Sequence, residues 1–513
     1  MNKSILKWNL IFQYGYVVTN IINSIILLPF YLKKIDASTL GLWLATGNIL
    51  AWMTLVDPGV GDILQQKIAE LRGKNNSEEI GKTIGSGLVA AAGILLISVI
   101  AGFIFFFLIG TIINKDVTQY PNLQMALLIT IISTGMSLVS FSVSGINQGL
   151  HNASQVAISS ILANILFLVI NLILLNLEFG VISIAFANLC RALFINIYNF
   201  SALKVVVNKE NIRIKFITDH FKSFVKIFSF TSLASIIGGL SSSMDTIVLA
   251  RFISPAMITI FEVNKRPIQL TQSMVGRHSV ALMPLVSHAR GSDDREGIIN
   301  LISIQFKYYS YVALFIAIIF CFEYKDLISA WTGTGKYAGN TIVYLLVANF
   351  LFGLIGYFMS NMGYALGDIK VNSLVNISRG IGIGILLYVV GKSYGIIGIL
   401  SVALFGNVVI ETLFFTYRLF KLGFLTKNLI KSTTVLWLIN IPLIAIGCWG
   451  ARLLINSWVG INMHVVKIVL NSSAFTLIFI GFIFLTDAVF RSDVLKILSP
   501  FNSKSQNTKK AFS

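Results

Sequence analysis

Four basic residues lie deep inside long apolar stretches of this sequence: Arg191, Lys265, Arg266 and Arg379. A charged side chain at the centre of a lipid bilayer costs about 2.5–3.5 kcal/mol on insertion scales, so it must face protein or water. Guanidinium groups bind phosphate oxygens through two parallel hydrogen bonds, so a water-filled cavity lined by these residues would attract a diphosphate. The alternative is ion pairing between helices, for example of Arg191 or Arg379 with a buried acid, which would serve assembly alone.

One acid precedes the central basic pair. Glu262 lies three and four residues before Lys265 and Arg266, so on a helix it can pair with either of them but cannot neutralise both. Pro267 follows directly and cannot donate to the helical hydrogen-bond ladder, which predicts a hinge. This segment therefore keeps a net positive charge beside a hinge.

The acids that could gate transport, or couple it to a gradient of H+ or Na+, are Asp57, Asp245, Glu262 and Glu411. Asp57 stands in an Asp-Pro-Gly turn sequence, so its alternative role is to accept backbone N–H bonds in that turn. Residues 62–74 place Leu and Ile at helical spacing among Lys, Arg and Glu, which predicts a short amphipathic helix on the inner membrane surface.

About fourteen apolar runs carry these residues. A helix needs about 20 mostly apolar residues to cross a hydrocarbon core of about 30 Å, and these runs have that length. The predicted spans cover residues 9–31, 39–56, 82–113, 121–147, 153–176, 180–203, 224–250, 256–286, 302–322, 340–364, 369–391, 394–418, 433–455 and 464–487. The sequence therefore predicts an all-α integral membrane protein, and an even number of spans puts both termini on one side.

The composition agrees with a membrane protein that has no large soluble domain. Hydrophobic residues make up 56% of the chain and charged residues 12%, against about 25% charged in an ordinary soluble domain. The longest polar stretches, 207–222 and 488–513, are too short for a catalytic domain.

The net charge of +18 is unevenly distributed. With the N-terminus in the cytoplasm, 26 Lys and Arg fall in inner segments and 9 in outer segments. This bias follows the positive-inside rule, so the basic character indicates orientation and contact with anionic membrane lipids rather than with nucleic acid. Both termini are expected in the cytoplasm.

Other chemistries have no visible site. Cys190, Cys321 and Cys448 lie far apart at apolar positions and are expected to be packing residues. The five histidines form no H-E-x-x-H pattern, and the segment 333–336 (GTGK) lacks the P-loop spacing, so we expect no metal site and no cofactor. The first apolar run lacks a small-residue cleavage site and is expected to be a membrane span.

The order of the spans predicts a division into lobes. Residues 1–206 would form an N-terminal lobe with spans 1–6, followed by a cytoplasmic basic linker at 207–222. Residues 223–422 would form a C-terminal lobe with spans 7–12, followed by accessory spans 13 and 14 in 423–487 and a cytoplasmic tail at 488–513.

Two motifs resemble those of bacterial polysaccharide flippases, the O-antigen and lipid-linked oligosaccharide exporters of the multidrug/oligosaccharidyl-lipid/polysaccharide (MOP) superfamily. Residues 40–43 (LGLW) and 57–61 (DPGVG) are similar to the YGLW and D-L-G-x-G signature of that family, and 245–253 (DTIVLARFI) is similar to its D-x-x-x-L-G-x-F-L segment. The chain departs from the pattern at Leu40, Pro58, Ala250 and Phe261, so contacts specific to one substrate cannot be carried over.

The resemblance implies a flippase that moves an undecaprenyl-diphosphate-linked oligosaccharide repeat unit, for O-antigen, lipopolysaccharide or another surface polysaccharide, across the inner (cytoplasmic) membrane. Two six-helix lobes would alternate access to a central cavity, and the two C-terminal helices would be accessory. No bond is made or broken, so no enzymatic activity is expected. A polysaccharide polymerase and a chain-length regulator are the protein partners that the resemblance implies.

Two other classes remain as alternatives. A multidrug and toxin extrusion pump of the same superfamily usually has twelve spans and binds cations through acids, whereas this chain has four embedded basic residues and two more spans. A membrane glycan polymerase or ligase usually presents a large external loop, and the outer connections here are short. Trp43, Trp52 and Trp331 lie near span ends, where we expect interfacial anchors; the alternative is a stacking platform for sugars.

Overall fold

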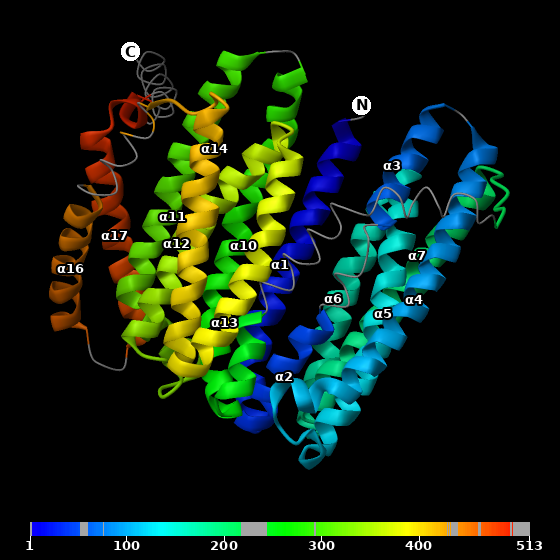
Figure 1. The fold of residues 1–513 in the computed structure, drawn as a ribbon, viewed down its shortest axis with the longest axis horizontal. Helices are drawn as coiled ribbons and strands as arrows, with labels where there is room; N and C mark the ends of the chain where they lie inside the picture. Colours follow the sequence, from blue (N-terminus) through cyan, green and yellow to red (C-terminus); the bar gives the residue numbers. More distant parts are fainter. Residues whose placement is uncertain are drawn as a thin grey trace, which may run out of the picture. The chain divides into compact units, whose positions relative to one another are not determined.

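The computed structural model describes residues 3–51, 60–74, 76–216, 244–291, 294–427, 440–459 and 463–492, together with 429, 431 and 495. All regular elements in these ranges are helices (Figure 1). Apart from residues at their ends, the predicted spans are helical wherever they are described. The all-α membrane fold is therefore confirmed. Asp57, Trp52 and residues 217–243 lie outside the described residues.

Eight stretches of helix in the described chain are long and apolar enough to cross a membrane. They comprise α4 (Ser77–Ile113), α5 (Pro121–Gly149), α6 (Ala153–Asn176), α7 (Val181–Lys209), α12 (Asn340–Ala365), the stretch Lys370–Lys421, α16 (Ile441–Trp458) and α17 (His464–Thr486). The other helices at predicted spans are α1 (Lys3–Lys34), α2 (Ala37–Ala51), α10 (Pro255–Gly291) and α11 (Arg295–Thr332).

The stretch Lys370–Lys421 contains the predicted spans 11 and 12. Helix α13 (Ile369–Phe405) changes direction at Gly395, which has φ 55° and ψ −137°, and not at the predicted joint 392–393. A positive φ suits glycine because it has no Cβ. A nine-residue π-helix, η3 (Gly406–Phe414), follows and leads into α14 (Phe415–Lys421).

Contacts divide the chain into two compact units. Unit 1 comprises Met1–Leu270 and Asp368–Gly406, and unit 2 comprises Thr271–Gly367 and Asn407–Ser513. The predicted lobe boundary at 207–222 runs into residues that the structure does not describe, so that division stays a prediction.

Buried amides and close-packed glycines hold the helices of unit 1 together. Asn147 on α5 donates to the carbonyl of Asn199 on α7 at 3.0 Å, and Asn196 donates to the carbonyl of Met136 at 2.8 Å. Such hydrogen bonds join helices in lipid, where apolar contact alone provides little driving force. The amphipathic helix predicted at 62–74 is α3 (Val60–Gly73), and a Cβ on Gly145 of α5 would overlap the backbone of its Gly61.

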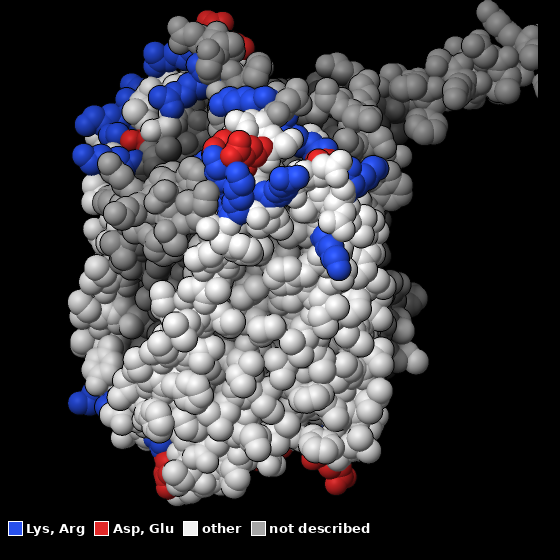
Figure 2. Space-filling view, turned by 90° about the vertical axis from the view of Figure 1, so that its right-hand side faces the viewer, with Lys and Arg blue, Asp and Glu red and all other residues white. Residues whose placement is uncertain are grey.

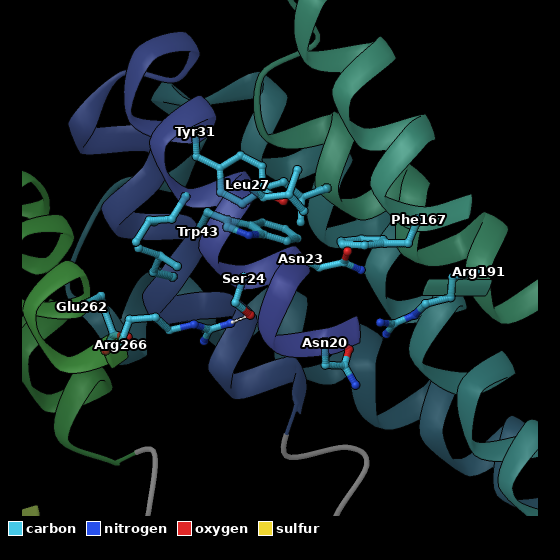
Figure 3. Close-up of a pocket in the computed structure, with 13 residues that line it drawn as sticks. Asn20, Asn23, Ser24, Leu27, Tyr31, Trp43, Phe167, Arg191, Glu262 and Arg266 are labelled. Carbon is cyan, nitrogen blue, oxygen red and sulfur yellow. Dashed lines mark hydrogen bonds between the residues drawn. The ribbon is translucent and has the colours of Figure 1, made fainter. Parts of the chain in front are cut away.

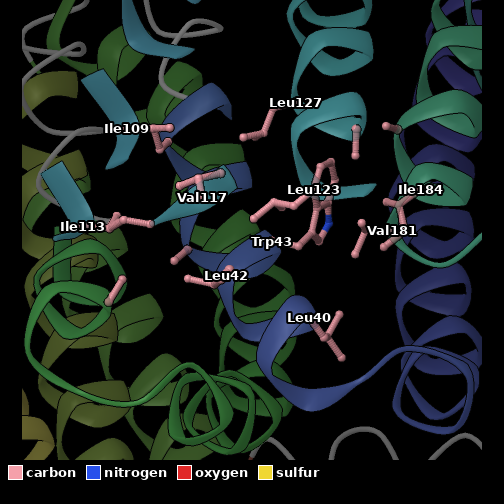
Figure 4. Packing of buried hydrophobic residues seen from close by; sticks show 14 of the residues in the cluster. Leu40, Leu42, Trp43, Ile109, Ile113, Val117, Leu123, Leu127, Val181 and Ile184 are labelled. Atoms are coloured by element: carbon pink, nitrogen blue, oxygen red, sulfur yellow. The ribbon is translucent and has the colours of Figure 1, made fainter. Parts of the chain in front are cut away.

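Helix α2 lies in a hydrophobic cluster of unit 1 (Figure 4). Trp43 is only 7% exposed and packs in this cluster with Leu123, Val181 and Ile184. It therefore lies in the protein interior and not at the lipid interface, because residues of α5 and α7 cover it. The short η2 helix (Val117–Gln119) contributes Val117 to the same cluster.

Two local features set the position of α2. The carboxylate of Asp36 accepts hydrogen bonds from the backbone N–H groups of Ser38 and Thr39, each at 2.9 Å, and so begins the helix. Burial by itself would raise the pKa of Asp36. The two backbone hydrogen bonds and a hydrogen bond from the Thr39 hydroxyl together lower the pKa by more than burial raises it, so it lies below its ordinary value. A Cβ on Gly41 would overlap the carbonyl oxygen of Pro255, so only glycine lets α2 approach the start of α10 this closely.

The outer surface of unit 1 has the polarity expected at a membrane. Figure 2 shows the side that carries α3, α4 and α7, where a broad uncharged band lies below the basic side chains gathered at one end. Large apolar residues of α4 are exposed, for example Leu96 and Phe107, which are 63% and 78% exposed. At the basic end, residues 212–216 run against Gly81 and Gly85 of α4, and Lys215 pairs with Glu78 at 2.9 Å.

In unit 2, the accessory helices α16 and α17 pack on α11. Their shared cluster contains Leu314, Cys448 and Phe475, all of them buried. Helix η3 packs tightly on α12, because a Cβ on Gly356 would overlap Glu411.

Candidate substrate cavity

A cavity of about 250 Å³ lies within unit 1 (Figure 3). Helices α1, α2, α6, α7 and α10 all contribute to its lining. The lining residues are Asn20, Asn23, Ser24, Leu27, Leu28, Tyr31, Trp43, Leu44, Phe167, Ile184, Arg191, Glu262 and Arg266. Two of the four sequence-predicted basic residues therefore line one cavity together with one of the predicted acids.

Arg191 and Arg266 reach the cavity from different helices at a similar depth. Arg191 follows the start of α7 by ten residues and Arg266 follows the start of α10 by eleven, so at 1.5 Å per residue each lies about 15–17 Å along its helix. Both starts are predicted to face outward, so these guanidinium groups are predicted to lie near mid-membrane. Arg266 donates to the Ser24 hydroxyl at 2.9 Å, and Arg191 lies over the Phe167 ring at 5.2 Å.

Lys265 is bound within the protein and is not among the lining residues. Its ammonium group pairs with Asp245 at 2.5 Å and lies 4.0 Å from Glu262. Glu262 also accepts a hydrogen bond from the Thr246 hydroxyl at 2.5 Å. With Arg191 and Arg266, these residues comprise three cations and two anions, so the formal charge of the group is positive.

The remaining walls of the cavity combine aromatic and aliphatic side chains with amide groups and Ser24. The hydroxyl of Tyr31 accepts a hydrogen bond from Asn171 at 2.6 Å, and Asn23 donates to the carbonyl of Asn164 at 2.9 Å. Both bonds join α1 to α6 and fix the wall that α1 presents. Cavities of this kind, apolar with a few placed polar groups, are typical ligand sites.

The other predicted site residues lie elsewhere. Arg379 is on α13 in unit 1, close to Gly406, and is not among the lining residues. Glu411 is on η3 in unit 2, where it is 8% exposed. Pro267 lies within α10, three residues before the boundary between the units at Leu270. The roles predicted for these residues, and for Asp57 outside the described residues, stay predictions.

The sequence analysis missed the polar wall of α1. Asn20, Asn23 and Ser24 have i, i+3 and i+4 spacing, and Leu27 and Tyr31 continue the same face. Three polar residues at helical spacing in an otherwise apolar span indicate a face turned away from lipid. This signal was present in the sequence.

A second group of charges, in unit 2, was also missed. Helix α11 continues ten residues beyond the predicted span 302–322 and carries Glu323, which is 2% exposed. Arg452 lies 3.0 Å from Glu323 and 3.7 Å from Asp326, and His464 lies 2.6 Å from Asp326. These contacts join α11 to α16 and α17. In the described part of the chain, no group of three or more His, Cys, Asp or Glu is placed to hold a metal ion.

Comparison with solved structures identifies the class of fold. The chain is similar to a multidrug resistance MATE family transporter of the MOP superfamily in an inward-facing conformation, with 14% identity and a TM-score of 0.67 over 80% of this chain and 95% of that one. It is similar to the lipid II flippase MurJ in an inward closed conformation, with 16% identity and a TM-score of 0.70 over 95% and 99%.

A third neighbour is the Vibrio cholerae MATE transporter VcmN, with 14% identity and a TM-score of 0.57 over 82% of this chain and 98% of that one. No family model and no curated protein sequence matches the chain. The protein is therefore a multi-pass membrane protein with the fold of MOP superfamily transporters. The superfamily fold that the motifs implied is confirmed, while the polysaccharide subfamily stays a prediction.

Proposed function

We propose that this protein is a flippase that moves an undecaprenyl-diphosphate-linked oligosaccharide repeat unit from the inner to the outer leaflet of the cytoplasmic membrane. The observation that carries the proposal is the convergence of Arg191 and Arg266 on one cavity. A buried site of this kind binds a diphosphate through charge-assisted, bidentate hydrogen bonds. A flippase among the structural neighbours supports this reading of the fold.

Charge separates this proposal from its main alternative, the export of organic cations. Glu262 and the rings of Tyr31, Trp43 and Phe167 would suit a flat cation. Two lining guanidinium groups oppose it, because one carboxylate cannot offset both and Lys265 already lies 4.0 Å from that carboxylate. The positive balance of the lining therefore favours an anionic ligand.

The experiment removes one charge at a time. Arg191→Gln and Arg266→Gln keep hydrogen-bonding capacity but lose the positive charge, so export of surface polysaccharide should fall at least tenfold, since each charge-assisted bond contributes about 1.5–3 kcal/mol. Arg191→Lys should recover part of the export, because a point charge still attracts phosphate. Lipid-linked glycan on the inner leaflet should rise in parallel.

Lys204→Gln is the matched control, since Lys204 is an exposed residue of the same helix α7. It should leave export unchanged. Full export by stable Gln variants at both cavity arginines would refute the anionic site and favour the multidrug pump. Loss of the protein from the membrane, reversed by neutralising an acid, would assign the arginines to assembly.

A further inference from the structure

The cavity has a second chemistry that a diphosphate does not use. Tyr31, Trp43 and Phe167 contribute aromatic rings to its lining, and Asn20 and Asn23 contribute amides. In Figure 3 the side chains of Arg191 and Arg266 enter from two different helices, and the rings of Tyr31 and Trp43 lie together on one side of them. A ligand bound by the arginines would therefore also meet these rings.

Two polar groups in this lining are available to a ligand. Within the described residues, neither the indole N–H of Trp43 nor the amide of Asn20 has a hydrogen-bond partner, although both residues line the cavity. Trp43 is 7% exposed, and a buried indole N–H normally finds an acceptor. The Trp43 N–H is a donor within the aromatic wall. Asn20 precedes Tyr31 by eleven residues on α1, about 16 Å along the helix, so its amide lies on the other side of the arginines from this wall (Figure 3).

Resting on the function proposed above, we propose that the Tyr31–Trp43 wall binds the first sugar of the substrate, the one bonded to the diphosphate. A pyranose presents an apolar C–H face that packs on an aromatic ring, and one of its hydroxyl or acetamido oxygens accepts from the Trp43 N–H. The first sugar is covalently bonded to the diphosphate. When the arginines bind the diphosphate, this sugar therefore lies beside the aromatic wall.

The size of the cavity restricts the subsite to one sugar. A volume of about 250 Å³ lies at the lower end of the usual range for ligand sites, which is about 300–1,000 Å³. The charged linkage and its first sugar are the parts that must be desolvated here, and the rest of the repeat unit lies outside this cavity. The protein would thus select substrates by the first sugar and tolerate variation beyond it.

The test compares two ligands that differ only in this sugar. Purified full-length protein in lipid nanodiscs is titrated calorimetrically with a short-chain polyprenyl diphosphate and with the same lipid carrying one N-acetylhexosamine. Trp43→Phe, which keeps a ring but removes the N–H, and Tyr31→Leu, which removes a ring of the wall, should each weaken binding of the glycosylated ligand roughly three- to tenfold. Binding of the bare diphosphate should not change.

Arg191→Gln should weaken binding of both ligands, and Trp449→Leu should weaken neither, because Trp449 is a 54% exposed residue of α16 in unit 2. Equal weakening of both ligands by Trp43→Phe and Tyr31→Leu, or no weakening of either, would overturn the sugar subsite. If Trp43→Phe does not fold, Tyr31→Leu decides alone. Absence of binding of both ligands to the wild-type protein would instead refute the proposed function.

Discussion

Lys265 is an embedded charge with two defined acidic partners. Its ammonium group lies between Asp245 at 2.5 Å and Glu262 at 4.0 Å, and the three side chains are between 9% and 15% exposed. A buried charge that loses its partner is costly, whereas the removal of both charges is close to neutral. Lys265 and Asp245 should therefore act mainly on stability.

We predict that Asp245→Asn destabilises the protein by somewhat less than the about 3–5 kcal/mol typical of a broken buried pair, since Glu262 remains near Lys265. The melting temperature in detergent and the amount of protein in the membrane should both fall. The double variant Asp245→Asn/Lys265→Gln should recover most of the loss. A stable Asp245→Asn protein that transports nothing would contradict a structural role and assign the acid to coupling.

Residue types and depth could be predicted from the sequence, but pairing could not. Glu262 was expected to pair with Lys265 or Arg266, and the structure adds Asp245, which is 20 residues from Lys265 along the chain. A partner at that distance depends on how two helices pack. Trp43 was misplaced for the same reason, since its position near a span end does not reveal the helices that cover it.

At the scale of elements, the motif 40–43 has a packing explanation. Gly41 and Trp43 point to different sides of α2, with Gly41 against Pro255 of α10 and Trp43 toward the cavity. The motif thus joins α2 to α10, which carries Glu262 and Arg266.

Gly41→Ala should therefore destabilise the protein by about 1–3 kcal/mol, the usual cost of an overpacked contact, because its Cβ would meet the backbone oxygen of Pro255. Thermal unfolding followed by size-exclusion chromatography would measure this. Gly93→Ala on α4 is the control: its Cβ would meet nothing within 4 Å, so stability should stay the same or rise slightly. Equal effects of the two substitutions would refute the close approach of α2 and α10.

Hydropathy located the spans but not their ends or joints. The predicted span 302–322 stops at the first charges, whereas α11 continues to Thr332 because Glu323 and Asp326 meet Arg452. The joint after span 11 lies at Gly395, where the positive φ that glycine permits decides the turn. The π-helix η3 has no counterpart in the apolar pattern; its Glu411 packs so closely on α12 that a Cβ on Gly356 would overlap it.

For the whole molecule, the charge bias predicts the orientation of the chain in the membrane. Alkaline phosphatase fused after Ser513 should be inactive, because the tail is expected in the cytoplasm, and a fusion near Lys336 should be active. Lys336 follows the end of α11 by four residues, in the connection to α12. Activity of the tail fusion would contradict an even number of spans.

The most direct test of the account is translocation by the purified protein alone. Proteoliposomes that contain the protein would be loaded with a polyprenyl-diphosphate-linked oligosaccharide, and a membrane-impermeant glycosidase would measure how fast the inner pool reaches the outer leaflet. We predict rapid exposure with the wild-type protein and at least tenfold slower exposure with Arg191→Gln, which removes one charge-assisted contact. Exposure no faster than in protein-free vesicles, or equal rates for the wild type and Arg191→Gln, would contradict the account.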